Sequence, residues 1–458
     1  MRLIPLRLIA ACLAAAAVVL LAASSARAVP SFALQTGQPC VSCHIGAFGP
    51  QLTAFGRAFK IGGYTQQGGD GWQAAIPASV MLLGSYSNTD KGAGAPVSEH
   101  YGDNGNFAMD QISVFLAGRV SENVGGFVQG TFNGISSTLK LDNSDLRATA
   151  PLDLGNDELR IGLDVNNGPT VQDPYATSYA WGFPYVASAL VTAPSAQPLL
   201  AGGLIGNSLG ATIYAWYNRS LYVEAGLYNT YGRTLLSITG NAYGPGATTN
   251  PAPYARAAYE WNWNNQSAYV GAILLHANIN PATGSFTSDG SFGHDGYTDY
   301  AVDGGYQFLG DGTNVVSVQG IFNHERQDLT GSFNAGTSSQ RGNSLDQFRA
   351  NVSYYYQQTY GATVGVQDTW GTGNPLLYAP AQLSGSANGK PNSKAIILEA
   401  DWVPFGKADS WASPWVNLKL GAQYTIYTQF NGAGKNYDGY GTNASDNNTL
   451  YVFAWLLF

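Results

Sequence analysis

The feature that most constrains the fold is a succession of stretches of about ten residues in which apolar and polar side chains alternate, with turn residues between them. Alternation with a period of two is typical of β-strands that have one apolar and one polar face. The sequence predicts sixteen such strands, an even number, as in single-chain bacterial outer-membrane barrels. The expected strands are 76–87, 106–120, 124–133, 137–149, 156–167, 209–218, 221–230, 254–263, 266–278, 297–308, 313–327, 343–357, 360–370, 392–403, 414–428 and 448–458.

The connections between these stretches alternate in length. Those after even strands are mostly tight, such as 264–265, whereas those after odd strands are mostly long, such as 231–253. Short turns at one rim and long loops at the other are typical of outer-membrane barrels, and they predict both chain ends on the periplasmic side. The longest connection, 168–208, is rich in aromatic residues and is expected to fold over or into the lumen.

The composition favours a membrane barrel over a soluble enzyme. Charged residues make up 11% of the chain, against about a quarter in typical soluble domains, while there are 57 Gly, 28 Tyr and 10 Trp. The final strand should turn Leu450, Val452, Ala454, Leu456 and Phe458 toward outer-membrane lipid. The alternative is a buried strand of a soluble sandwich. A net charge of −8 argues against nucleic acid as a partner.

The first residues have the pattern of an export signal. Arg2 and Arg7 precede an apolar run, 8–23, and the run is followed by Ala26-Arg27-Ala28. These features predict a signal peptide, 1–28, that is cleaved after Ala28 in a Gram-negative cell. After it, no apolar stretch is long enough to span a membrane as a helix.

The run Cys40-Val41-Ser42-Cys43-His44 is the candidate cofactor-binding site. A C-x-x-C-H pentapeptide predicts one covalent haem c, with Cys40 and Cys43 as thioether tethers and His44 as the axial iron ligand. The alternative is a redox dithiol or a disulfide followed by an incidental histidine. A haem segment at 29–71 is too small to bury a haem alone, so we expect it to plug the lumen of a barrel at 72–458.

The residues after the pentapeptide predict a short amphipathic helix. Pro50 is expected to start this helix, and Leu52, Phe55 and Phe59 recur after it at helical spacing and would form one apolar face against the haem. In the same stretch, Arg57 and Lys60 could bind the haem propionates. The alternative is that the helix packs on the barrel wall and both cations are solvated.

The sixth iron ligand is less defined by the sequence. The alternation of the first strand points Met81 into the lumen, which makes it a candidate distal axial ligand, and Met109 is expected to share that orientation on the second strand. The alternative is that both methionines only line the plug. Histidines 100, 276, 294 and 324 are expected at the outer rim or in loops.

Six acidic residues fall in the outer part of the predicted barrel, where their oxygens would suit a transient ferrous ion. We read them as a solvated surface and assign no metal site to them. They are Asp90, Glu99, Asp103, Asp289, Asp295 and Asp299.

The run from Pro30 to Gly37, the pentapeptide, and the run from Phe48 to Lys60 together resemble the fused cytochrome–porins of iron-oxidising bacteria. The resemblance covers about forty residues and implies a monohaem cytochrome joined to a sixteen-stranded outer-membrane barrel. It also implies transfer of electrons from extracellular Fe(II) to a periplasmic c-type cytochrome or other soluble carrier. Whether the chain counts as an enzyme, an Fe(II):cytochrome c oxidoreductase, stays open. The alternatives are a conduit for another donor or acceptor and a haem-gated transport porin.

Overall fold

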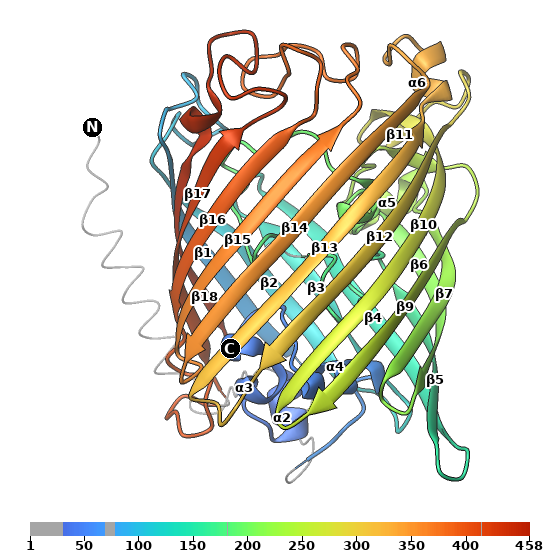
Figure 1. Ribbon diagram of the computed structural model, residues 1–458, viewed down its shortest axis with the longest axis vertical. Helices are drawn as coiled ribbons and strands as arrows, with labels where there is room; N and C mark the ends of the chain where they lie inside the picture. The colour runs from blue at the N-terminus through green and yellow to red at the C-terminus, as the bar shows by residue number, and fades with distance from the viewer. Residues whose placement is uncertain (1–30, 69–77, 181, 414) are drawn as a thin grey trace.

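A computed structural model describes residues 31–68, 78–180, 182–413 and 415–458, and these form a closed barrel of tilted strands with a helical segment inside one end (Figure 1). The predicted signal peptide, its cleavage site and the boundary between residues 71 and 72 lie outside the described residues. Among the described residues, no helix is long and apolar enough to cross a membrane.

The described strands form one antiparallel sheet in which sixteen long strands make the wall, as the sequence predicted. Two further strands, β8 (Gly246–Thr248) and β11 (Thr287–Ser288), are short additions. The wall strands are β1 (Ala78–Thr89), β2 (Asn106–Arg119), β3 (Val124–Asn133), β4 (Thr138–Asp153), β5 (Glu158–Asn166), β6 (Ser208–Tyr217), β7 (Leu221–Thr230), β9 (Ala252–Trp263), β10 (Gln266–Gly284), β12 (Asp295–Phe308), β13 (Asn314–Asp328), β14 (Gly342–Tyr356), β15 (Tyr360–Gly371), β16 (Ser393–Trp402), β17 (Asn417–Gln429) and β18 (Thr449–Leu457).

The sheet closes because β1 pairs with both β2 and β18. Most connections at one end are tight: Asn264 and Asn265, between β9 and β10, have φ values of 45° and 58°, as the central pair of a type I′ hairpin requires. The C-terminus lies at this end, and the long loops lie at the other (Figure 1). We therefore take the end with the tight turns as periplasmic, as the sequence predicted.

Side chains alternate across the wall. On β16 the buried residues include Glu399 and Asp401, while Ile396 and Leu398 are exposed on the outside. A closed sheet satisfies every backbone hydrogen bond of its wall, and an apolar exterior suits hydrocarbon. The expected lipid-facing set on β18 is confirmed for the alternate residues Leu450, Val452 and Ala454, which are exposed.

The N-terminal segment consists of short helices: α2 (Ser31–Thr36), α3 (Cys40–Cys43), η1 (Ile45–Ala47) and α4 (Ala54–Ile61). The expected helix start at Pro50 is wrong, because α4 begins after Thr53, whose side chain accepts a hydrogen bond from the Gly56 amide. The expected apolar face is also wrong in part: Phe55 is 36% exposed, whereas Phe59 is buried.

A second segment, 168–207, lies inside the barrel, which confirms the expectation that this connection enters the lumen. It reaches the wall through Thr177, whose hydroxyl donates to Asp303 (2.6 Å), and Ser188, whose hydroxyl donates to Asp110 (2.6 Å). It contains η2 (Leu199–Ala201). The remaining helices belong to the outer loops and are α5 (Arg233–Thr239), α6 (Thr330–Asn334) and η3 (Ala444–Asn447).

Candidate functional site

The pentapeptide sits on α3 and the turn that follows it. The His44 amide donates to the Cys40 carbonyl (2.9 Å), which closes one helical turn and places both cysteines and the histidine within it. Both thiols are free. The three residues that the sequence singled out are therefore brought together by local structure alone.

The packing of α4 fixes the orientation of α3. The Thr53 amide donates to the Cys43 carbonyl (2.9 Å), and a Cβ at position 56 would overlap that same carbonyl oxygen. Glycine at position 56 thus allows the two backbones to approach closely.

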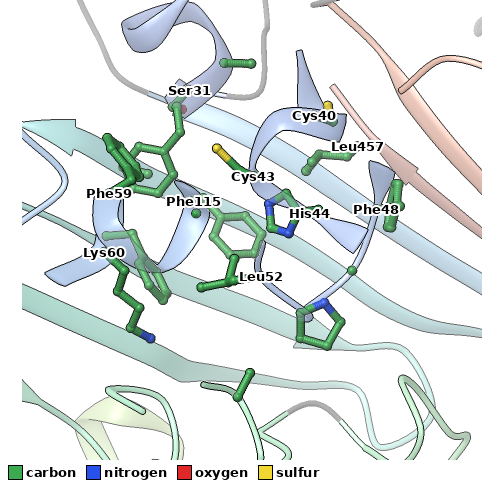
Figure 2. A pocket seen from close by; sticks show the side chains of 18 of the residues that line it. Ser31, Cys40, Cys43, His44, Phe48, Leu52, Phe59, Lys60, Phe115 and Leu457 are labelled. Carbon is green, nitrogen blue, oxygen red and sulfur yellow. The ribbon is translucent and has the colours of Figure 1, made fainter. Parts of the chain in front are cut away.

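Cys40, Cys43 and His44 line a cavity of about 280 Å³ between the helical segment and the barrel wall. Figure 2 shows Cys43 and His44 in this cavity between Phe59 on one side and Phe48 on the other. The wall contributes mainly apolar and aromatic side chains to the lining. They are Met81, Phe115, Ala117, Phe127, Trp455 and Leu457.

These wall residues locate the cavity along the barrel axis. Met81 lies near the start of β1, Phe115 near the end of β2, and Leu457 at the end of β18. All three positions are close to the end that carries the tight turns. The cavity therefore lies at the periplasmic end of the lumen.

Burial sets the protonation of the three chemical groups. It lowers the pKa of His44 to about 4, so the imidazole is neutral at physiological pH. It raises the pKa of Cys40 to about 11 and that of Cys43, which also has Cys40 beside it, to about 12. Burial therefore favours the protonated form of both thiols.

The chemistry of the donor set fits a c-type haem. Two thiols are available for thioether bonds, and the neutral His44 imidazole lines the same cavity. The aromatic and aliphatic lining suits a large apolar macrocycle. Within the described residues, no group of three or more His, Cys, Asp and Glu side chains is placed to hold a bare metal ion.

Lys60 also lines the cavity, as its expected contact with a propionate requires. Its ammonium donates to the carbonyl of Val171 in the luminal segment and lies 3.3 Å from Asp145 of β4. Lys60 is thus already held by one carboxylate, at the edge of the cavity.

Arg57 has another partner. Its guanidinium forms a two-pronged ion pair with Glu260 of β9, Nη2 to Oε1 at 2.7 Å and Nε to Oε2 at 3.1 Å, and also donates to Ser267 and Gln307. Arg57 and Glu260 are 1% and 2% exposed. The structure therefore assigns Arg57 to the attachment of the helical segment to the wall, in place of the expected contact with a propionate.

The structure places the two candidate methionines on opposite faces of the barrel wall. Met81 is 4% exposed and faces the cavity, as expected. The expectation that Met109 faces the lumen is wrong, because it is 43% exposed on the outside of the barrel. The register between β1 and β2 shifts between Leu83 and Gly84, and this bulge moves Met109 to the opposite face.

The wall residues that complete the cavity carry no motif that predicts them from the sequence. Trp455 packs edge-on against Phe48, with ring centroids 5.1 Å apart, and Asn417 donates to the Ala47 carbonyl (2.7 Å). The alternation of side chains shows which residues near the periplasmic ends of the strands point into the lumen. It does not show which of those residues contact the helical segment.

The closed sheet, its apolar exterior and its polar interior decide the class of protein. The chain is an outer-membrane β-barrel. Its solved structural likenesses include OprB of Pseudomonas putida (11% identity, TM-score 0.47), covering 83% of this chain and 93% of that one. They also include OmpF of Salmonella typhi (12%, 0.46; 83% and 97%) and an anion-selective porin from Comamonas acidovorans (13%, 0.45; 84% and 98%). No protein-family model and no curated protein matches the chain.

Proposed function

We propose that this barrel is an outer-membrane monohaem cytochrome that passes electrons from extracellular ferrous iron to a soluble periplasmic carrier. The observation that carries the proposal is the placement of Cys40, Cys43 and His44 around one apolar cavity inside the lumen. The resemblance of residues 30–60 to the cytochrome–porins of iron-oxidising bacteria supports ferrous iron as the donor.

The residues of the cavity would divide the work of holding one haem c. Cys40 and Cys43 would tether it, and the neutral His44 imidazole would bind the iron, for which an unprotonated ring nitrogen is needed. Lys60, which is paired with Asp145 at the edge of the cavity, would donate its remaining N–H to a propionate. When bound, the haem supplies a one-electron couple, so no acid–base residue is required.

The position of the cavity suits delivery of an electron to a periplasmic carrier. Each ferrous ion gives up one electron to become ferric on the outside, and each carrier molecule gains one electron in the periplasm. A cofactor at the periplasmic end of the lumen is near the carrier and separated from the donor by segment 168–207.

The proposal is tested by the visible spectrum of the oxidised, detergent-purified protein during anaerobic addition of ferrous iron, with dithionite as the control for full reduction. We expect a reduced c-type spectrum with both reagents. A spectrum that responds to dithionite alone would eliminate ferrous iron and leave a conduit for another donor. Absence of any haem spectrum would overturn the proposal.

Met81 is the proposed sixth ligand, because it is the sulfur-bearing wall residue of the cavity. Met81→Leu preserves most of the volume but removes the thioether, so we expect loss of the methionine-to-iron charge-transfer band and a lower reduction potential. Potentiometric titration measures the change. Met109→Leu, on the outside of the barrel, is the matched control and should leave both properties unchanged. Retention of the band in Met81→Leu would exclude Met81 as the ligand.

A further inference from the structure

The cavity that holds the pentapeptide has a second end, away from Cys40. Figure 2 shows Cys40 and Lys60 on opposite sides of His44 in this cavity. In a haem c, the thioether bonds and the propionates are at opposite edges of the macrocycle. A haem that is tethered by Cys40 and Cys43 therefore directs its propionates toward the end of the cavity where Lys60 lies.

The first turn of the luminal segment 168–207 covers this end. The Lys60 ammonium donates to the Val171 carbonyl, and Thr170, Val171 and Asp173 all line the cavity. The Asp173 amide donates to the Thr170 carbonyl (3.3 Å), which closes a turn and fixes the backbone at Thr170. Because threonine is branched at Cβ, its first side-chain torsion is restricted, so the turn also limits the directions in which the hydroxyl can point.

The Thr170 hydroxyl is an unused polar group at this end of the cavity. Thr170 is 3% exposed, and its Oγ1 has no hydrogen-bond partner within the described residues. Burial of a hydroxyl without a partner is unfavourable, and buried polar side chains are normally hydrogen-bonded. The molecule that occupies the cavity can supply the missing partner.

Asp173 is the carboxylate that lines the same end, and it would repel a propionate if it were unpaired. Its Oδ1 lies 3.2 Å from Arg256 Nη2. Its Oδ2 accepts hydrogen bonds from the Thr177 amide (3.0 Å) and hydroxyl (3.1 Å). Asp173 is therefore already paired, which leaves the Thr170 hydroxyl and the Lys60 ammonium to bind an anion.

We infer that Thr170 donates a hydrogen bond to a haem propionate and that, together with Lys60, it forms the propionate-binding site. The inference rests on the proposed function, since it requires a haem c in the cavity. It gives the luminal segment a part in binding the cofactor, beside the helical segment. A hydrogen bond to a propionate reduces the negative charge near the iron, which favours the ferrous form and raises the reduction potential.

Thr170→Val tests the hydrogen bond, because it removes the hydroxyl and keeps the shape of the side chain. The low-frequency propionate bending mode of the resonance Raman spectrum reports on hydrogen bonds to the propionates, and we expect it to shift in this variant. Hydrogen bonds to charged groups are among the stronger ones, so the equilibrium constant for haem reduction should fall about threefold or more. Potentiometric titration measures that constant. Thr170→Ser restores a hydroxyl and should restore both properties.

Thr36→Val is the matched control. Thr36 also lines the cavity and is 3% exposed, but its hydroxyl donates to the Phe32 carbonyl (2.7 Å). The same substitution at this position should therefore leave the propionate mode unchanged. Heat-modifiable gel mobility verifies that each variant is folded.

The outcomes separate the inference from the proposed function. An unchanged propionate mode in Thr170→Val would overturn the hydrogen bond and leave water as the partner of the hydroxyl. A shift that also occurs in Thr36→Val, or that Thr170→Ser does not reverse, would overturn it as well, because a general change in the cavity would explain the spectrum. Absence of haem from the unmodified protein would overturn both the proposed function and the inference. If the haem is present but ferrous iron does not reduce it, only the donor is eliminated, and the Raman comparison still decides the role of Thr170.

Discussion

Simultaneous replacement of Cys40 and Cys43 by alanine is expected to abolish covalent haem attachment completely while the barrel still assembles. Both thiols line the cavity, and neither is in a disulfide. They are the cysteines of the described residues, so their removal leaves no thiol there for a thioether bond to the haem. The wall closes through backbone pairing of β1 with β18, which does not involve these side chains. The loss should therefore be specific to the cofactor.

Haem-dependent peroxidase staining after denaturing electrophoresis measures the covalent link, and heat-modifiable mobility measures assembly of the barrel. Ser42→Ala is the matched control, because Ser42 lies between the two cysteines on α3 and its hydroxyl contacts only Gln38 (3.2 Å) among the described contacts. It should stain like the unmodified protein. Staining that persists in the double alanine variant would contradict thioether attachment, and a lack of staining in the unmodified protein would contradict the haem itself.

The wall of the barrel was predictable because two local signals agree along its whole length. The period of two identifies each strand, and turn residues such as Asn264 and Asn265 mark where the chain reverses. The same local reasoning identified Cys40, Cys43 and His44 as one group, since they occupy a single helical turn. The entry of segment 168–207 into the lumen was also expected from its length and composition.

The errors arose where distant parts of the chain meet. The partner of Arg57 is 203 residues away on β9, and no local pattern indicates that pairing. A single bulge reversed the orientation of Met109, because one extra residue exchanges the two faces of a strand. The expectation that Asp295 and Asp299 lie on a solvated surface is wrong, because they are 2% and 0% exposed, and Leu200 of the luminal segment contacts Asp299. Such contacts depend on how the lumen is filled.

Glu260→Gln is expected to loosen the helical segment from the wall. The variant leaves the Arg57 guanidinium buried without its carboxylate, and removal of one partner from a buried ion pair typically costs about 3–5 kcal/mol. If this free energy destabilises only the docked state of residues 31–68, the undocked population rises about a hundredfold or more. Trypsin cleavage after Arg57 and Lys60 should accelerate by a similar factor, because proteolysis of a transiently opened segment follows its population.

Two comparisons identify the cause of faster cleavage. Glu158→Gln removes the partner of Arg219 in an ion pair at the periplasmic rim, where the side chains of Glu158 and Arg219 are 38% and 69% exposed. Exposed ion pairs contribute about 0–1 kcal/mol to stability. The rate of cleavage in this variant should therefore not change. The double variant Arg57→Met, Glu260→Met removes both charges and should restore slow cleavage after Lys60, since an apolar pair has no unpaired charge to bury. If Glu260→Gln is cleaved no faster than the unmodified protein, the other contacts of the segment hold it in place. Those contacts include Tyr64 with Asp145 (2.7 Å) and Tyr214 with the Ile61 carbonyl (2.6 Å).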